Sequence, residues 1–489
     1  MKSEKCFRID ECGTATKHLE IWLKKINLRP LHKALTRARC ATDNATPKRA
    51  SINATAVARG KAFAAVYLLK FLSLFIISLG LPVLLFAQGN QIQIPGLNNS
   101  PLVSQAANAP IITSRAAVML DARTGTILYA KNAYEEISPA SLTKLMTMHL
   151  LQNEIYAGRV SPHDIIPITS ESWAINQPPR SSLMFLGPGQ TVKLGDILLG
   201  LAVSSGNDAS VAAALSLAPT VADFAILMNN EARRLGLKNT YFVEPSGVSE
   251  LNMSCAADFA FFSRYYINKH PNSLKNYHSV REFSYPKAEN VAPAYRNDPR
   301  TISQNNRNSL LRSFPGVDGL KTGYLDISGF NIVLTAERNH NRFIAVILGA
   351  PAGPGGERIR EEDSSRLLSW AFDNFKTVYP EIGEIPGTRL WKGKENIAYF
   401  RLIQADPLAP NSTIFTSPVQ RANSLWVSYE YIYPLKAPLP ANFPAGTLII
   451  SDEYGELHRV QLLTTREYEK ANIFKRMWHN LRLLFHRNK

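Results

Sequence analysis

Apolar residues occur along the middle of the chain in two patterns, short unbroken runs typical of strands and spacings typical of helices. Apolar runs on either side of turn residues predict hairpins over 116–131 and over 330–336 with 342–349. Spacings of three and four residues predict helices, and these cover 141–152, 195–217 with a break at 204–207, 221–236 and 366–375. Because hairpins lie at both ends with helices between them, we predict an α/β domain with an antiparallel sheet over 111–378.

A different pattern begins near residue 380, where the helical spacing stops and Pro, Tyr and Val become frequent. Short alternating runs separated by turn residues follow, and they cover 389–400, 425–431, 446–451 and 458–463. Runs of this kind without helices between them are typical of all-β domains. We therefore predict a small all-β domain over 379–466.

The N-terminal part of the chain carries an apolar segment that indicates export. Residues 71–87 are uncharged, follow the basic residues Arg59, Lys61 and Lys70, and end in Ala87. A basic start, an apolar stretch and a small residue at its end are typical of a signal peptide, although the stretch also suffices for a short membrane anchor. We predict a disordered basic extension over 1–58, a signal peptide or anchor over 59–87 and a polar linker over 88–110.

At the other end, residues 470–486 predict an amphipathic helix. Basic residues occupy one side of it, and the apolar positions on the other side are Ile473, Phe474, Met477, Trp478, Leu481, Leu484 and Phe485. A basic amphipathic helix with aromatic residues lies flat on an anionic membrane surface. We predict a membrane-anchor helix here, with packing against the β domain as the alternative.

The charges that make up the formal net charge of +16 are unevenly distributed along the chain. Residues 1–87 contain 15 basic and 5 acidic residues, residues 88–469 contain 34 of each, and residues 470–489 contain 6 basic and no acidic ones. The excess is therefore confined to the two ends, and a neutral body argues against a nucleic-acid-binding protein. The four cysteines and ten histidines show no metal-binding spacing, so we expect no metal.

Three short motifs in the predicted α/β domain combine residues that suit serine chemistry. In Ser141-Leu-Thr-Lys144, a lysine lies one turn after a serine at a predicted helix start, where its amine can act as a base. Ser205-Gly206-Asn207 places a hydroxyl and an amide on the predicted helix break. Lys321-Thr322-Gly323 places a cation and an open backbone on a strand edge. Taken singly, each motif is more often a surface helix, a capping turn or a strand end.

Together, the order and surroundings of these motifs resemble the low-molecular-mass penicillin-binding proteins, which are serine-type D-alanyl-D-alanine carboxypeptidases. The similar segments are 139–147, 188–191, 205–209, 237–247 and 319–323, and the resemblance extends over roughly 112–465. It implies a penicillin-recognising, β-lactamase-like α/β fold, followed by the small all-β domain and the C-terminal amphipathic helix. It also implies that no metal or organic cofactor takes part, while the charge distribution already argues against a nucleic-acid partner.

The resemblance further implies the role of each motif residue in removing the last D-alanine from a peptidoglycan stem pentapeptide. The implied catalytic residues are Ser141 as nucleophile, Lys144 as its base and Ser205 as proton carrier. The implied substrate-binding residues are Asn207, Lys321, Thr322, Gly323 and Tyr324. Backbone N–H groups of Ser141 and Tyr324 would form the oxyanion hole. β-Lactams would acylate Ser141, and similar C-terminal tails imply attachment to the periplasmic face of the bacterial inner membrane.

Three positions depart from the pattern of that family. Tyr324 stands where His is frequent, Leu325 where Thr is common and Glu244 where Asn is common. Glu244-Pro245 also resembles the deacylating carboxylate loop of class A β-lactamases, although its flanking residues favour an ordinary loop residue. A D,D-endopeptidase and a class A-like β-lactamase on the same fold remain as alternative functions. The full set of motif residues argues against a further alternative, a non-catalytic wall-binding or penicillin-trapping protein.

Overall fold

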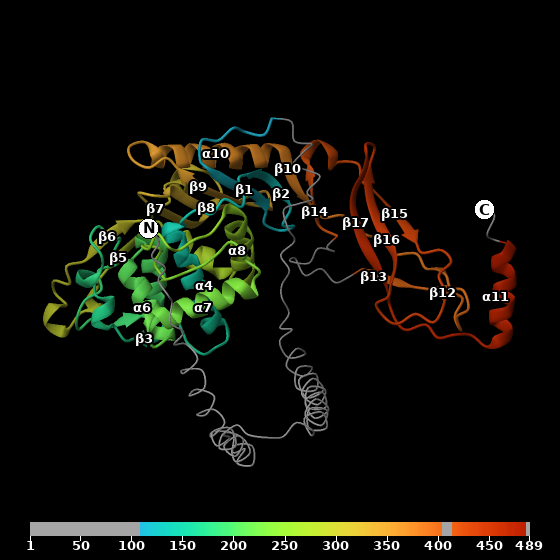
Figure 1. Ribbon diagram of the computed structural model, residues 1–489, viewed down its shortest axis with the longest axis horizontal. Coiled ribbons are helices and arrows are strands. Elements are labelled where there is room, and N and C mark those ends of the chain that lie inside the picture. The colour runs from blue at the N-terminus through green and yellow to red at the C-terminus, as the bar shows by residue number, and fades with distance from the viewer. Residues whose placement is uncertain (1–107, 403–412, 486–489) are drawn as a thin grey trace, which may run out of the picture. The chain divides into compact units, whose positions relative to one another are not determined.

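The structure of the protein is a computed structural model that describes residues 108–402 and 413–485 (Figure 1). The basic extension, the signal peptide or anchor and most of the linker are predicted within 1–107 and lie outside the described residues. The described residues belong to one compact unit, Asn90–Lys489.

A five-stranded antiparallel sheet forms the centre of the α/β domain, with strands in the order β2–β1–β9–β8–β7 (Figure 1). The strands are β1 Ala116–Asp121, β2 Ile127–Lys131, β7 Val317–Leu325, β8 Gly329–Arg338 and β9 Asn341–Ala350. Val118 faces Ala130 between β1 and β2, and Val333 faces Val346 between β8 and β9. Both predicted hairpins are therefore confirmed, and β7 is the edge strand beside β8.

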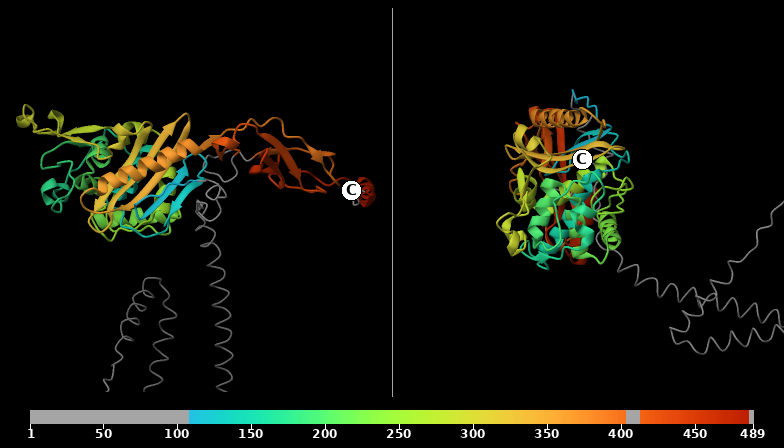
Figure 2. Two further views of the ribbon diagram at one scale, coloured as in Figure 1. Left: turned by 90° about the horizontal axis from the view of Figure 1, so that it is seen from above. Right: turned by 90° about the vertical axis from the view of Figure 1, so that its left-hand side faces the viewer.

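Alternation along the strands gives this sheet two buried faces. In β1, Val118 and Leu120 belong to one hydrophobic core, whereas Ala117 and Met119 belong to the other. Helix α8 packs on the first face with the helices α4, α6 and α7 beyond it, and α10 runs across the second face (Figures 1 and 2). Because both faces are covered, the inner strands β1 and β9 are nearly continuous apolar runs.

The helices of this domain agree in part with the predictions. They are α4 Lys144–Tyr156, α5 Leu194–Leu199, α6 Asn207–Leu217, α7 Val221–Arg234, α8 Ala256–Lys269, α9 Leu310–Ser313 and α10 Gly356–Asn374. The break predicted at 204–207 is present, where the π-helical turn η5 Gly200–Ser204 ends before α6. Helix α8 was not predicted. Helix α10 begins ten residues before the predicted 366, because its first half has Ile359 as its one apolar side chain and buries polar residues such as Arg360 and Asp363, so no apolar spacing marks it.

Residues Val378–Tyr468 enclose a third hydrophobic core in the predicted β domain. Its four-stranded antiparallel sheet has the order β13–β17–β16–β15, with β13 Phe400–Leu402, β15 Trp426–Tyr431, β16 Pro444–Asp452 and β17 Gly455–Thr464. The prediction of one run over 389–400 was wrong. The N–H of Leu390 bonds to the carbonyl of Asn396, so the chain folds back and forms β11 Thr388–Arg389 and β12 Ile397–Ala398 as a separate pair.

Short elements complete the fold. Paired strands are β3 Ile165–Ile166 with β4 Val192–Lys193, β5 Glu282–Tyr285 with β6 Ile302–Asn305, and β10 Phe375–Val378 with β14 Phe415–Pro418. The C-terminal helix is α11 Ile473–Phe485. Within the described ranges no single helix is long and apolar enough to span a membrane, although α6 and α7 pass that test as a bent pair.

Candidate active site

The first motif lies at the entrance to α4. Ser141 is part of the 3₁₀ turn η2 Ala140–Thr143, and α4 begins only at Lys144. The expectation that Ser141 opens an α-helix is therefore wrong in detail, since the tighter turn comes first. The spacing still brings the two side chains together, with Lys144 Nζ 3.0 Å from Ser141 Oγ.

The amine of Lys144 is completely buried and has three hydrogen-bond partners. It donates to Ser141 Oγ, to Asn207 Oδ1 at 2.8 Å and to the carbonyl oxygen of Ser246 at 2.6 Å. Burial disfavours the ammonium form and lowers the pKa of Lys144 to about 7. An amine with this pKa is unprotonated in a large fraction of molecules near neutral pH, as a general base must be.

The second motif connects the helix break to the third motif. Ser205 has left-handed backbone angles between η5 and α6, and its Oγ accepts a hydrogen bond from Lys321 Nζ at 2.9 Å. Asn207 begins α6 and donates from Nδ2 to Ser181 Oγ at 3.0 Å. Asn207 therefore contacts the Lys144 amine from a helix that starts 63 residues after that lysine, and Ser205 contacts Lys321 just before the same helix.

The third motif lies on the edge strand β7, where Lys321 and Thr322 are buried. Burial, reinforced by the Lys144 cation, lowers the pKa of Lys321 well below its usual value. A Cβ added at Gly323 would lie 3.0 Å from the backbone nitrogen of Ser141. The absence of a side chain at Gly323 therefore lets the edge strand approach the nucleophile turn closely.

Tyr324 is the motif neighbour whose side chain is directed elsewhere. It is 41% exposed, its hydroxyl donates to Asp326 at 2.7 Å, and its ring packs on Phe330 with centroids 4.4 Å apart. The geometry thus connects the side chains of Ser141, Lys144 and Asn207 and those of Ser205 and Lys321, places the backbone of Gly323 against Ser141, and leaves the ring of Tyr324 at the margin. Thr322 is buried beside Lys321 on β7. Among residues 108–402 and 413–485, no cluster of three or more His, Cys, Asp or Glu could hold a metal ion.

Sequence reasoning missed three contributors to this site. Ser246 supplies a backbone carbonyl to Lys144, and the cation of Arg307 adds to burial in lowering the pKa of both Lys144 and Lys321. Asp208 is completely buried and anchors the backbone of residues 184–186 beside the site. Of these three, only Asp208 could have been found from the sequence, because it directly follows the second motif.

Comparisons with known proteins identify similar D-alanyl-D-alanine carboxypeptidases. A family profile, peptidase S11, described as D-alanyl-D-alanine carboxypeptidase, matches residues 103–352. The carboxypeptidase DacC of Escherichia coli is 32% identical over 78% of this chain and 91% of its own length. DacD of Salmonella typhimurium is 34% identical over 77% of this chain and 91% of its own length.

Solved structures show the same similarity. Penicillin-binding protein 5 of Haemophilus influenzae has a TM-score of 0.65 at 30% identity, and the match covers 75% of this chain and all of that one. Penicillin-binding protein 6B of Escherichia coli has a TM-score of 0.58 at 30% identity, covering 75% of this chain and 99% of that one. Each match is longer than the α/β domain alone, so the similarity includes residues outside that domain.

Proposed function

The chain belongs to the peptidase S11 family of D-alanyl-D-alanine carboxypeptidases, and on this premise we propose how its own residues carry out the reaction. The protein is a serine-type D-alanyl-D-alanine carboxypeptidase, a hydrolase of the penicillin-binding type. We assign the catalytic roles to Ser141, Lys144 and Ser205. We assign substrate binding to Asn207, Lys321, Thr322, Gly323 and Tyr324.

Acylation begins when Ser141 Oγ attacks the carbonyl carbon between the two terminal D-alanines of a stem pentapeptide. Lys144, whose Nζ lies 3.0 Å from that oxygen, takes the hydroxyl proton. The peptide C–N bond then breaks, and the departing nitrogen receives a proton through the hydroxyl of Ser205. The products of this step are free D-alanine and an ester on Ser141.

Substrate binding in the proposal depends on the edge of β7. Lys321 and Thr322 hold the terminal carboxylate of the peptide, and this anion restores the positive charge that burial disfavours on Lys321. The backbone N–H groups of Ser141 and Tyr324 bind the developing oxyanion, an interaction worth about 3 kcal/mol per donor. Water then hydrolyses the ester, with Lys144 as the base.

The contact between Lys144 and Ser141, together with the lowered pKa of Lys144, carries this proposal. The test is intact-mass analysis after ampicillin, followed by D-alanine release from a pentapeptide. We expect the parent protein to gain one ampicillin and Ser141→Ala to gain none and release no D-alanine. An adduct that persists in Ser141→Ala would refute Ser141 as the nucleophile.

The two alternative functions on the same fold are those of a D,D-endopeptidase and a class A-like β-lactamase. An endopeptidase of Pseudomonas aeruginosa is 28% identical over 80% of its own length, so release of D-alanine must be compared with cleavage of cross-linked peptides. A β-lactamase would need Glu244 to activate water. The structure instead engages both of its carboxylate oxygens with hydrogen-bond donors of its own turn, which favours the carboxypeptidase.

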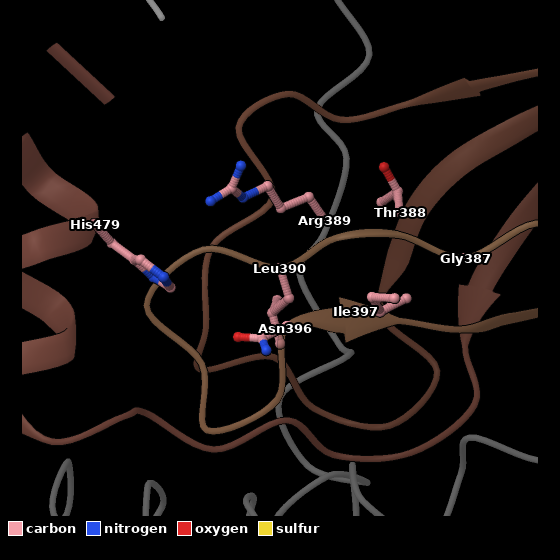
Figure 3. A pocket seen from close by; sticks show the side chains of 7 residues that line it. All are labelled: Gly387, Thr388, Arg389, Leu390, Asn396, Ile397 and His479. Carbon is pink, nitrogen blue, oxygen red and sulfur yellow. The ribbon is translucent and has the colours of Figure 1, made fainter. Parts of the chain in front are cut away.

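We propose in addition that α11 attaches the exported protein to the periplasmic face of the inner membrane. Its seven apolar positions are all at least 48% exposed, whereas His479 is buried against the β domain and accepts a hydrogen bond from the N–H of Lys392 at 2.7 Å. A cavity of about 380 Å³ lies between His479 and the β11–β12 pair (Figure 3). His479 thus lies on the docked side of the helix, and the exposed apolar side is available to lipid.

Deletion of residues 470–489 tests this attachment. We expect the shortened protein to remain in the supernatant with vesicles of anionic phospholipid, and the full protein, freed of its N-terminal segment, to sediment with them. Undiminished sedimentation of the shortened protein would refute the role of α11.

A further inference from the structure

Glu244 is a half-buried carboxylate in the turn that follows α7, and its hydrogen bonds remain within that turn. Its Oε2 accepts from the N–H of Ser246 at 2.7 Å and from its Oγ at 2.6 Å. Its Oε1 accepts from the N–H of Gly247 at 2.7 Å, from the N–H of Ser249 at 3.3 Å and from Asn252 Nδ2 at 2.7 Å. A carboxylate has about four lone-pair sites, so the turn uses its accepting capacity fully.

The turn that Glu244 organises contacts both the Lys144 amine and the nucleophile turn. The carbonyl of Ser246 accepts from Lys144 Nζ at 2.6 Å, the shortest of that amine's three contacts. Gly247 has a φ of +81°, and a Cβ added there would lie 1.8 Å from the carbonyl oxygen of Ala140. The turn is therefore packed directly against the nucleophile turn, and a change in its shape moves the Ser246 carbonyl relative to Lys144.

Four charged groups act on Lys144 or share its surroundings. The carboxylates of Glu244 and of Asp208 on α6 raise the pKa of Lys144, and Glu244 has the larger effect. The guanidinium of Arg307 lowers it. Lys321 on β7 is a further buried lysine nearby, and burial together with the Lys144 cation lowers its pKa. Burial alone would therefore place the pKa of Lys144 lower than the value near 7.

We propose that Glu244 is a positioning residue for acylation: its carboxylate holds the turn that presents the Ser246 carbonyl to the Lys144 amine and keeps a negative charge in the surroundings of that amine. The inference rests on the proposed role of Lys144 as base. It differs from the role of a water-activating carboxylate, because such a role needs an acceptor oxygen that the turn does not already use. It also assigns a purpose to the carboxylate at a position where the resemblance leads one to expect Asn.

The test compares the pH dependence of acylation by a fluorescent penicillin between about pH 5 and about pH 9. In Glu244→Gln the negative charge is gone, so we expect the midpoint of the rising limb to move down by about one pH unit. Glu244→Asp retains the charge and is expected to keep its midpoint within about 0.3 units of the parent. Glu250→Gln is the matched control, since it removes the charge of an exposed glutamate six residues further along.

Each result has a defined meaning. A reduced plateau with an unchanged midpoint in Glu244→Gln would assign Glu244 a purely structural role and overturn the inference, as would an upward shift. If thermal melting shows that Glu244→Gln is not folded, Glu244→Asn carries the same charge change and is interpreted by the same criterion. Rapid acylation of Lys144→Ala would instead refute Lys144 as the base, so the two failures are distinguishable.

Discussion

The buried carboxylate of Asp208 anchors one wall of the site, and we predict that Asp208→Asn weakens both the fold and acylation. Its Oδ1 accepts from the N–H groups of Met184 at 2.8 Å and Ala209 at 2.9 Å. Its Oδ2 accepts from the N–H groups of Phe185 at 2.8 Å and Leu186 at 3.0 Å. In the asparagine variant an NH₂ group replaces one of these oxygens. Replacement of Oδ2 leaves the N–H groups of Phe185 and Leu186 without an acceptor, whereas replacement of Oδ1 leaves only that of Ala209, because Met184 also reaches Oδ2 at 3.1 Å.

The size of the effect follows from that count. A buried donor without a partner costs about 1–3 kcal/mol, so the loss of one or two acceptors costs about 2–4 kcal/mol. In a domain of this size such a loss lowers the melting temperature by about 10 °C. The same loop bonds to Asn207 through Ser181 and Ser182, and Asn207 in turn positions Lys144. We therefore expect acylation to slow by about 10-fold or more.

Thermal melting monitored by near-ultraviolet circular dichroism checks the loss of stability. Acylation rates measured well below the melting transition check the slower reaction. Asp223→Asn is the control, because the same chemical change is made at an exposed carboxylate in the first turn of α7. We expect that control to cost less than about 1 kcal/mol. A melting temperature of Asp208→Asn within about 2 °C of the parent, with unchanged acylation, would refute the reasoning.

Three further predictions concern other parts of the protein. The acylation rate of the parent protein should rise with pH through a midpoint near 7, because only the neutral amine of Lys144 can accept the proton of Ser141. Stopped-flow measurements with a fluorescent penicillin give this midpoint, and a midpoint above about 9 would contradict the prediction. Gly247→Ala should lose at least about 2 kcal/mol of stability and most of its acylation rate, since the added Cβ would meet the carbonyl of Ala140. Thermal melting and acylation measurements test this, and unchanged stability and rate would exclude the close contact. His479→Ala should make α11 more sensitive to limited proteolysis, because Lys392 loses its acceptor, while binding to anionic vesicles persists; equal cleavage of both proteins would argue against docking through His479.

Much of the fold follows from local patterns. The hairpins β1–β2 and β8–β9 were predicted because turn residues separate apolar runs, and the helix break before α6 was predicted from Ser and Gly within an apolar helix. Helix α8 and the first half of α10 were missed. Charged and aromatic residues interrupt the spacing there, and tertiary burial rather than an amphipathic pattern stabilises these segments.

The residues of the candidate site likewise fall into those that the sequence predicted and those that it did not. Ser141, Lys144, Ser205, Asn207 and the Lys321 motif were all recognisable from their types, order and neighbours. The groups that complete the site around Lys144 have no recognisable sequence motif. The Ser246 contact is a backbone carbonyl, which any residue could supply, and Arg307 acts from a loop through its charge alone.

The sequence by itself determined which side chains are available for catalysis, in what order they occur and where the charge of the chain is concentrated. Only the tertiary structure decided that Lys144 is fully buried between Asn207 and Ser246, and that Lys321 meets Ser205 across 116 residues of chain. The physical reason is that the pKa of a lysine depends on the solvent and the charges around it. These are set by segments that are remote along the chain and become neighbours only when the sheet and helices pack.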